Sequence, residues 1–253
     1  MNACRFLSLA AAFGLVSVAI ASDDPNAVIL RAIELMPRGG GYSASAAANQ
    51  KLASALHHDG ATLTISPAQA RPSYCSCATF LVFAAALQDL AARGDIHLSR
   101  ETLDALLVTG QRDGEGVWGR WNANGPGTAR LFAETGLGRN FANWSEARSG
   151  DFMKIWWTAE IGQRERGHSV IFLGTERIEG VESVRFWSSN QPDGYGEKCV
   201  PRAKIAWAVF SRLERPARAS RLAELPRHDA FLASMLARRF TRQDVKQSCN
   251  VPD

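Results

Sequence analysis

Residues 74–87 read Tyr-Cys-Ser-Cys-Ala-Thr-Phe-Leu-Val-Phe-Ala-Ala-Ala-Leu, which places Cys75 and Cys77 directly in front of a continuous apolar run. The run predicts a helix that opens at Ser76 or Cys77 and continues to about Ala92. A cysteine in the first turn of a helix lies beside unpaired backbone N–H groups and the positive end of the helix dipole, which lower the pKa of its thiol. Because the thiolate is the nucleophilic form, this stretch predicts the reactive atom of a cysteine hydrolase.

The bulk composition is that of an ordinary globular chain of 253 residues, with 46% hydrophobic and 21% charged residues. The net charge is only +4 and no dense block of Lys and Arg occurs, so nucleic-acid binding is not predicted. The mild positive charge does suit an anionic cell-wall polymer. No glycine-rich phosphate loop precedes a Lys-Ser/Thr pair, and the cysteine and histidine spacings match no common zinc pattern. We therefore expect no metal and no other cofactor.

The N-terminus has the pattern of an export signal. Arg5 supplies a positive start, residues 6–20 are largely apolar, and Ala19-Ile20-Ala21 forms a small-residue cleavage site. The alternative is a short membrane anchor, but the run is too short to span a bilayer comfortably. We expect a signal peptide at residues 1–21, a periplasmic or secreted protein, and no integral membrane segment in the mature chain.

Cleavage removes Cys4 and leaves Cys75, Cys77, Cys199 and Cys249. In an oxidising compartment an even number of cysteines predicts disulfides. Cys199 and Cys249 form the expected structural pair, because that bond pins the C-terminal tail to the body. Cys75 and Cys77 are too close in sequence to bridge each other without strain, although either one can be structural.

Helices precede strands along this chain, which predicts an α+β fold with an antiparallel sheet. Three regions follow the signal peptide: an N-terminal helical region at 22–66, a catalytic domain at 67–215 and a C-terminal helical extension at 216–253. The expected helices are 24–36, 44–57, about 76–92, 100–108, 129–134 and a basic helix within 222–240; the expected strands are 61–65, 152–157, 168–173, 181–188 and 204–212.

One histidine stands apart from the other four as a candidate general base. His168 follows Gly167 and starts an apolar strand, whereas the others lie in polar segments and are expected at the surface. A third polar residue is expected to hold the other ring nitrogen of His168. Asn190 is the best chemical match and Ser188 the alternative; residues 188–196 can also be only a polar turn. The four surface histidines are His57, His58, His97 and His228.

Tryptophans gather near the predicted catalytic segment. The long polar stretch 111–128 contains Trp118, Trp121 and Asn122, and Trp156 and Trp157 end a predicted strand. Exposed tryptophans stack on sugar rings and peptide planes, so Trp118, Trp121, Asn122 and Trp156 are candidate substrate-binding residues. The alternative for the tryptophans is burial in the core.

The order of these motifs resembles the NlpC-type cell-wall peptidases, part of the papain-like clan that also includes the CHAP amidases. The family's Cys-Ser-Gly is represented by Cys75-Ser76-Cys77, its Gly-Asp strand by Gly150-Asp151-Phe152-Met153, and its Gly-His strand by 167–174, Gly-His-Ser-Val-Ile-Phe-Leu-Gly. The resemblance covers about residues 70–210. This chain departs from the family in having Cys77 in place of glycine, a long separation between cysteine and histidine, and no histidine on the following strand.

The resemblance implies a papain-like fold in which the nucleophile helix packs on an antiparallel sheet. It also implies a Cys-His hydrolase, with Cys75 as nucleophile and His168 as base, that cleaves amide bonds in peptidoglycan stem peptides. Cys77 remains the alternative nucleophile, because Ser76-Cys77-Ala78-Thr79-Phe80 is similar to the pattern of papain itself. Two other functions stay open: a transglutaminase-like acyl transferase, and a non-catalytic wall-binding module stabilised by disulfides.

Overall fold

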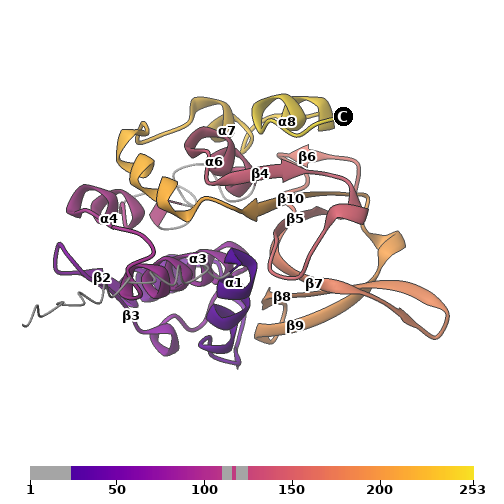
Figure 1. Cartoon of the computed structure of the whole chain (residues 1–253). Helices are drawn as coiled ribbons and strands as arrows, with labels where there is room; N and C mark the ends of the chain where they lie inside the picture. The colour runs from indigo at the N-terminus through magenta and orange to yellow at the C-terminus, as the bar shows by residue number, and fades with distance from the viewer. Residues whose placement is uncertain (1–23, 110–115, 118–124) are drawn as a thin grey trace, which may run out of the picture.

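The computed structural model describes residues 24–109, 116–117 and 125–253, and its central element is a seven-stranded antiparallel sheet (Figure 1). The mixture of helices with a large antiparallel sheet confirms the α+β prediction. In spatial order the strands are β1 (Gly39–Gly40), β9 (Gly194–Pro201), β8 (Val181–Asn190), β7 (His168–Ile178), β5 (Phe152–Trp156), β10 (Trp207–Leu213) and β4 (Gly138–Phe141). Two-stranded sheets pair β2 (Leu56–His58) with β3 (Leu63–Ile65) and β6 (Ile161–Gly162) with β11 (Arg239–Phe240).

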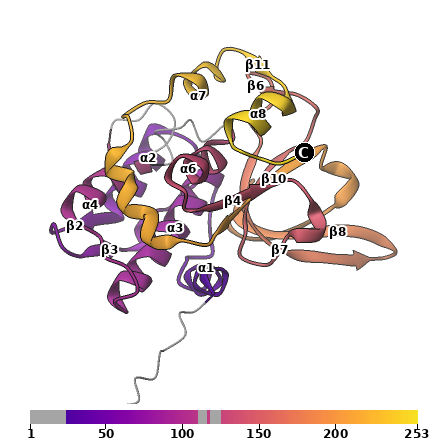
Figure 2. The same cartoon turned by 45° about the horizontal axis from the view of Figure 1, so that its top comes forward.

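The helices pack around this sheet, and the two views of the ribbon show α1 beside α3 (Figures 1 and 2). The α-helices are α1 (Pro25–Glu34), α2 (Ala46–Ser54), α3 (Cys75–Ala92), α4 (Arg100–Leu106), α6 (Gly127–Thr135), α7 (Ala230–Ser234) and α8 (Arg242–Ser248). The 3₁₀ helices are η1 (Pro67–Gln69), η2 (Trp144–Glu146), η3 (Arg202–Lys204) and η4 (Pro216–Glu224).

The central helix is α3, which begins at Cys75, one residue before the predicted start. Every residue from Ser76 to Leu87 is buried, as expected for a helix that is apolar on all sides. Within the described residues, α3 is the one helix long and apolar enough to cross a membrane. Since 72% of that apolar window is buried inside the protein, it gives only weak support for a membrane span.

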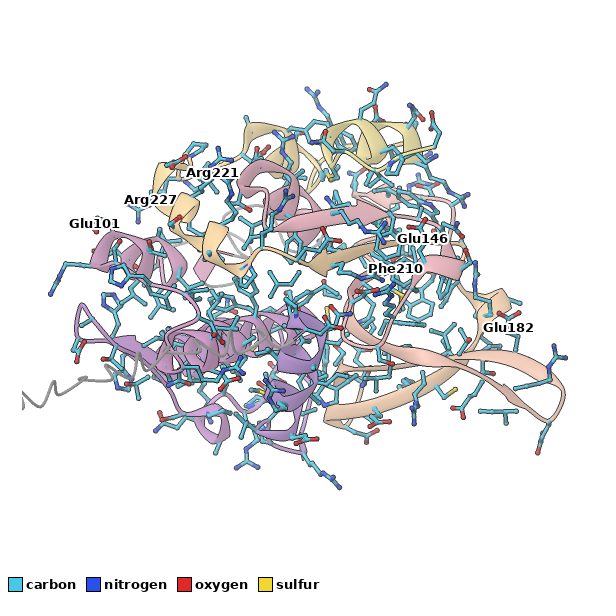
Figure 3. The ribbon with its side chains drawn as sticks, in the orientation of Figure 1. Glu101, Glu146, Glu182, Phe210, Arg221 and Arg227 are labelled. Atoms are coloured by element: carbon cyan, nitrogen blue, oxygen red, sulfur yellow. The ribbon has the colours of Figure 1, made fainter. Side chains whose placement is uncertain are left out.

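Two hydrophobic cores lie on opposite faces of the sheet. The larger one joins α3 and α6 to the sheet, where the ring of Phe152 meets Phe83 and Phe132 edge-on at centroid distances of 6.1 and 5.7 Å. The smaller one contains the stacked rings of Phe141 and Phe210, whose centroids lie 5.3 Å apart. Phe210 is labelled in Figure 3. Strands buried on both faces form a rigid platform for the residues at their ends.

The Gly150-Asp151 motif fixes where β5 begins. Asp151 is fully buried and pairs with Arg212 of β10, whose Nη2 lies 2.7 Å from Asp151 Oδ2. Asn26 of α1 donates to Asp151 Oδ1 at 2.9 Å. Gly150 has φ +93°, and a Cβ there would lie 2.7 Å from the carbonyl oxygen of Asn26, so only glycine fits. The motif therefore ties α1, β5 and β10 together.

The helix predicted at 44–57 is shorter than expected. It ends at Ser54, and the chain continues into β2, where Leu56 pairs with Ile65. The hairpin buries Leu56 and Leu63, an apolar contact that favours a strand over another helical turn. The basic helix predicted within 222–240 is also wrong, because its basic part at 235–239 forms a turn and the start of β11. The rest of 222–240 holds the end of η4 and the short α7. Pro226 interrupts the run, since proline removes a helix N–H.

Candidate active site

Cys75 stands at the first position of α3. The preceding residue, Tyr74, is extended, with φ −135° and ψ 169°, so the chain turns sharply into the helix. Ser73 anchors this entry, because its Oγ donates to Ser189 Oγ on β8 at 2.8 Å and its carbonyl accepts from Ser43 N at 2.8 Å. The end of the helix that carries the thiol is thereby fixed against the sheet.

His168 opens β7 and packs between two aromatic rings. Its centroid lies 5.7 Å from that of Phe186, edge-on, and 6.2 Å from that of Trp157. Gly167, just before it, has φ +68°, and a Cβ there would lie 2.5 Å from the carbonyl oxygen of Ile155. Only glycine allows the backbone to pass this close to β5, so the glycine of the Gly-His motif determines where the imidazole lies.

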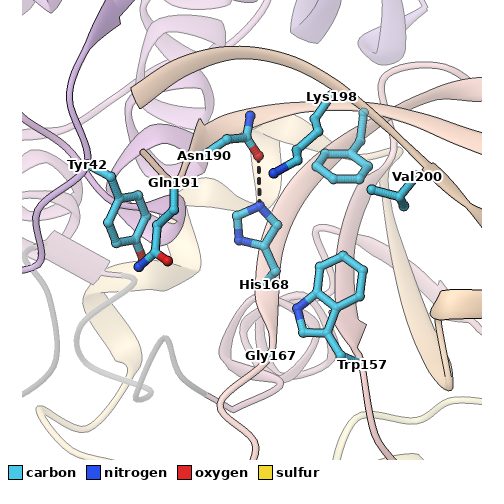
Figure 4. A pocket seen from close by; sticks show the side chains of 9 residues that line it. Tyr42, Trp157, Gly167, His168, Asn190, Gln191, Lys198 and Val200 are labelled. Carbon is cyan, nitrogen blue, oxygen red and sulfur yellow. Dashed lines mark hydrogen bonds between the residues drawn. The ribbon is translucent and has the colours of Figure 1, made fainter. Parts of the chain in front are cut away.

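Asn190, at the end of β8, holds the imidazole in one orientation (Figure 4). Its Oδ1 lies 3.1 Å from His168 Nε2, while its Nδ2 donates to the carbonyl of Gly196 at 2.9 Å. Because the amide N–H₂ group is engaged by that carbonyl, Oδ1 must be the atom that faces the ring, and the neutral imidazole must carry its proton on Nε2. Nδ1 is then left free to accept a proton from a thiol.

The thiol of Cys75 meets His168 across the junction of helix and sheet. Burial alone raises the pKa of a thiol, but a hydrogen bond with His168, the charges of His168 and Lys154, and a hydrogen bond from the Ser169 backbone together outweigh it. The pKa of Cys75 is lowered to about 6. Cys75 therefore carries a thiolate at neutral pH.

Cys77 has the opposite environment. Its side chain is 1% exposed, and its sulfur lies 3.8 Å from the hydroxyl of Tyr195. Burial raises the pKa of Cys77 to about 12. Of the two candidate nucleophiles, the geometry favours Cys75.

Tyr42 is a site residue that sequence reasoning missed. Burial, the neighbouring charge of Cys75 and a hydrogen bond to its sulfur raise the pKa of the Tyr42 hydroxyl. Two backbone contacts hold it there: its N–H donates to the Pro192 carbonyl at 3.1 Å, and it bridges in parallel to Ser73. Tyr42 follows three glycines far upstream of the cysteines, and no local pattern connects it with them.

His168, Asn190 and Tyr42 line a cleft of about 290 Å³ that Figure 4 shows from close by, and Cys75 lies beside His168 without being one of its described lining residues. Besides His168, Asn190 and Tyr42, its lining includes Trp157, Gln191 and Lys198. Trp157 is 37% exposed, so an aromatic face is available beside the His168 imidazole. The cleft is open at the surface, and its volume is close to the lower end of the range for small-molecule sites.

Other predicted site residues lie elsewhere. Ser188 is fully buried and donates to the Ser169 carbonyl at 2.7 Å, so it does not hold the imidazole. Trp156 does not line the cleft, because it is fully buried and stacks on Trp207 at 4.9 Å. Trp118, Trp121 and Asn122 lie outside the described residues. Residues 191–193 after Asn190 form a turn between β8 and β9, so 188–196 is not only a polar turn: it also holds the end of β8 and the start of β9.

The expected Cys199–Cys249 disulfide is wrong, since all four described cysteines are free. Cys249 ends α8 and is fully buried, and its carbonyl accepts from Asn140 of β4 at one end of the sheet order. Cys199 lies on β9, near the other end. The two sulfurs are therefore held by opposite parts of the molecule.

Within the described part of the chain, no group of three or more His, Cys, Asp or Glu side chains is placed to hold a metal ion. Comparisons of this chain with protein-family models, with curated proteins and with solved structures find no match. Any inference about the chemistry of this site therefore depends on the arrangement of its own residues.

Proposed function

We propose that this protein is an exported cysteine hydrolase that cleaves amide bonds in peptidoglycan stem peptides through an acyl-enzyme intermediate. The observation that carries the proposal is the contact between Cys75 and His168, with the imidazole held by Asn190 and the pKa of Cys75 lowered to about 6. A nucleophile, a base hydrogen-bonded to it and a third group that orients the base form the arrangement that acyl transfer requires.

The first half of the reaction acylates the enzyme. In the resting pair Nδ1 of His168 already holds the thiol proton, and the thiolate of Cys75 attacks the carbonyl carbon of the substrate amide. The developing oxyanion accepts hydrogen bonds from backbone N–H groups at the start of α3, and the Tyr42 hydroxyl is a further donor at that position. The C–N bond then breaks as the imidazolium returns its proton to the leaving amine.

The second half releases the acid. His168 removes a proton from water, and the hydroxide attacks the thioester carbon. The C–S bond breaks, the carboxylic acid leaves, and the proton on the imidazolium restores the resting pair. Asn190 keeps the same ring nitrogen hydrogen-bonded throughout, so one orientation of His168 serves both halves.

A papain-like fold and NlpC-type membership belong to this proposal. They are supported by the resemblance of the Cys-Ser, Gly-Asp and Gly-His motifs, and by the place of Cys75 at the start of a buried helix beside an antiparallel sheet. Export is supported by the signal-like N-terminus, and an acceptor in the cell wall by the mild positive charge and the exposed Trp157.

The deciding experiment is digestion of purified peptidoglycan sacculi, with mass analysis of the released fragments. We expect the wild-type protein to release stem-peptide fragments that carry one new carboxyl and one new amine. Cys75→Ala should abolish release, and Cys77→Ala, the matched control two residues away, should keep it. Activity in Cys75→Ala equal to wild type would end the proposal.

The same assay separates hydrolysis from acyl transfer. Adding a small primary amine gives an acyl transferase an acceptor, so its products gain the mass of that amine. A hydrolase gives the free carboxylic acid under the same conditions. If amine-labelled products far exceed the free acid, the protein is an acyl transferase and not a hydrolase. The roles proposed for Cys75 and His168 would still hold.

A further inference from the structure

One charged side chain in the cleft has no part in the mechanism. Among the lining residues that the structure describes, Lys198 of β9 is the only lysine or arginine, and none is an aspartate or glutamate. Lys198 forms no ion pair and no hydrogen bond with other described residues. The neighbouring carboxylate of Glu197 lines a different cavity together with Trp187, so it does not neutralise this lysine.

The sheet register carries Lys198 to the catalytic imidazole. Lys198 lies directly opposite Phe186 on β8, and the edge of the Phe186 ring contacts the His168 ring at a centroid distance of 5.7 Å. Directly opposed residues on neighbouring strands have adjacent side chains, so the stem of Lys198 runs over Phe186. Figure 4 shows its ammonium end directed toward the His168–Asn190 pair.

The same strand also orients the base. The carbonyl of Gly196, two residues before Lys198, accepts the hydrogen bond that fixes the amide of Asn190. Gly196 and Lys198 lie opposite Ser188 and Phe186 on β8, so both are on the stretch of β9 that pairs with the end of β8. Recognition by Lys198 and orientation of His168 are thus built on one segment of backbone.

The charges in the cleft are unbalanced without a ligand. The Cys75 thiolate already faces the positive charges of His168 and Lys154. Lys198 adds a further ammonium, and no described lining residue carries a carboxylate to pair with it. A carboxylate is the planar anion that peptides supply, and its hydrogen bonds with an ammonium are charge-assisted.

From these contacts we infer that Lys198 binds a free carboxylate of the substrate next to the scissile amide, so that the enzyme selects acidic peptides. The inference rests on the proposed function, and it names the substrate feature that this cleft selects. Lys198 is a specificity-determining residue in this arrangement and takes no part in bond breaking.

The test uses synthetic stem peptides: one with all carboxylates free, and a set in which each carboxylate in turn is a carboxamide. We expect one carboxamide to lower kcat/KM of the wild-type protein by about 10- to 100-fold, the range of a hydrogen bond to a charged group. In Lys198→Met, the ratio of kcat/KM for the free-carboxylate peptide to kcat/KM for that carboxamide should fall to about one. Lys198→Arg should keep most of the preference, and Lys204→Met, an exposed lysine outside the cleft, should keep all of it.

Failure of this inference is distinguishable from failure of the proposed function. Equal cleavage of all peptides by the wild-type protein, or a preference that survives in Lys198→Met, overturns the role of Lys198 while hydrolysis stands. If no peptide is cleaved, the proposed function fails, and the Cys75→Ala protein is titrated with the same peptides by calorimetry. If the peptides do not bind, or if none of the carboxamides changes their affinity, the carboxylate site is overturned as well.

Discussion

Cys75 and Cys77 both lie in the first turn of α3, but the surroundings of their thiols differ. Cys75 contacts His168 and has its pKa lowered to about 6, whereas Cys77 is buried and has its pKa raised to about 12. Each has its own tyrosine: Tyr42 hydrogen-bonds to Cys75, and the Tyr195 hydroxyl lies 3.8 Å from the sulfur of Cys77. The helix N-terminus is common to both, so it cannot be what makes one thiol reactive.

The difference shows that the direction in which each cysteine side chain points determines whether its thiol is reactive. Residues two positions apart on a helix point to different sides, so one sulfur turns to the sheet edge and the other to the core. A helix dipole contributes only about 0.3–1 kcal/mol at an exposed terminus, which is less than the cost of burying a thiolate. The hydrogen bond and charge of His168 supply most of the remainder, with further contributions from the charge of Lys154 and the Ser169 backbone.

Removing the imidazole should therefore give the largest change. We expect His168→Ala to lower kcat/KM by about 10²- to 10⁴-fold, the contribution of a general base. The pKa of Cys75, measured from the pH dependence of iodoacetamide alkylation, should rise above about 6, because the hydrogen bond and charge of His168 are lost. His97→Ala, an exposed histidine, is the matched control. An unchanged alkylation pKa would show that the helix end suffices.

The contrast between the thiols can be measured directly by alkylation of the native protein. At pH 7 the thiolate fractions differ by about 10⁵-fold, and the weaker nucleophilicity of a low-pKa thiolate removes about 10³ of this. We expect Cys75 to react at least about 100-fold faster than Cys77, with a rate that rises through about pH 6 and then levels off. Peptide mapping of the labelled protein locates each adduct. If Cys75 and Cys77 were labelled at comparable rates in the folded protein, the proposed difference in reactivity between them would be wrong.

The sign of the pH effect on stability follows from the same pKa. The folded protein lowers the pKa of Cys75, so it favours the thiolate more than the unfolded chain does. This contribution to the free energy of unfolding is fully present above the thiol's ordinary pKa, and it is lost as the pH falls through about 6.

How much of this site could be predicted from sequence depended on whether its residues lie in regular patterns. Cys75 and His168 open an apolar helix and an apolar strand, and Asn190 ends strand β8, in which Val184 and Phe186 alternate with polar neighbours. Strand β9 was missed because Gly194–Pro201 has little alternation, its burial coming from pairing with β8. Tyr42 was missed because backbone contacts with Ser73 and Pro192, distant in sequence, bring it to the cleft.

A smaller effect is expected from the group that orients the base. Asn190→Ala removes the acceptor for His168 Nε2–H, which becomes a bond to a charged ring in the ion pair. We expect kcat to fall by about 10- to 100-fold with little change in KM. Asn190→Asp keeps an acceptor and should recover part of the loss, although its second oxygen then faces the Gly196 carbonyl. A purely structural Asn190 would give no recovery in kcat, and equal loss in both variants would show this.

The smallest effect on activity is expected from the tyrosine that contacts Cys75, and none from the tyrosine that contacts Cys77. Tyr42→Phe keeps the ring and removes only the hydroxyl that bonds to Cys75, so we expect kcat to fall about tenfold with the thermal midpoint nearly unchanged. Tyr195→Phe is the matched control: its hydroxyl donates to the Ala70 carbonyl at 2.7 Å, and its loss should cost about 1 kcal/mol of stability and no activity. Steady-state kinetics and chemical denaturation of both variants measure the two effects. If Tyr195→Phe lost activity and Tyr42→Phe did not, the catalytic side of α3 would be the one that faces the core.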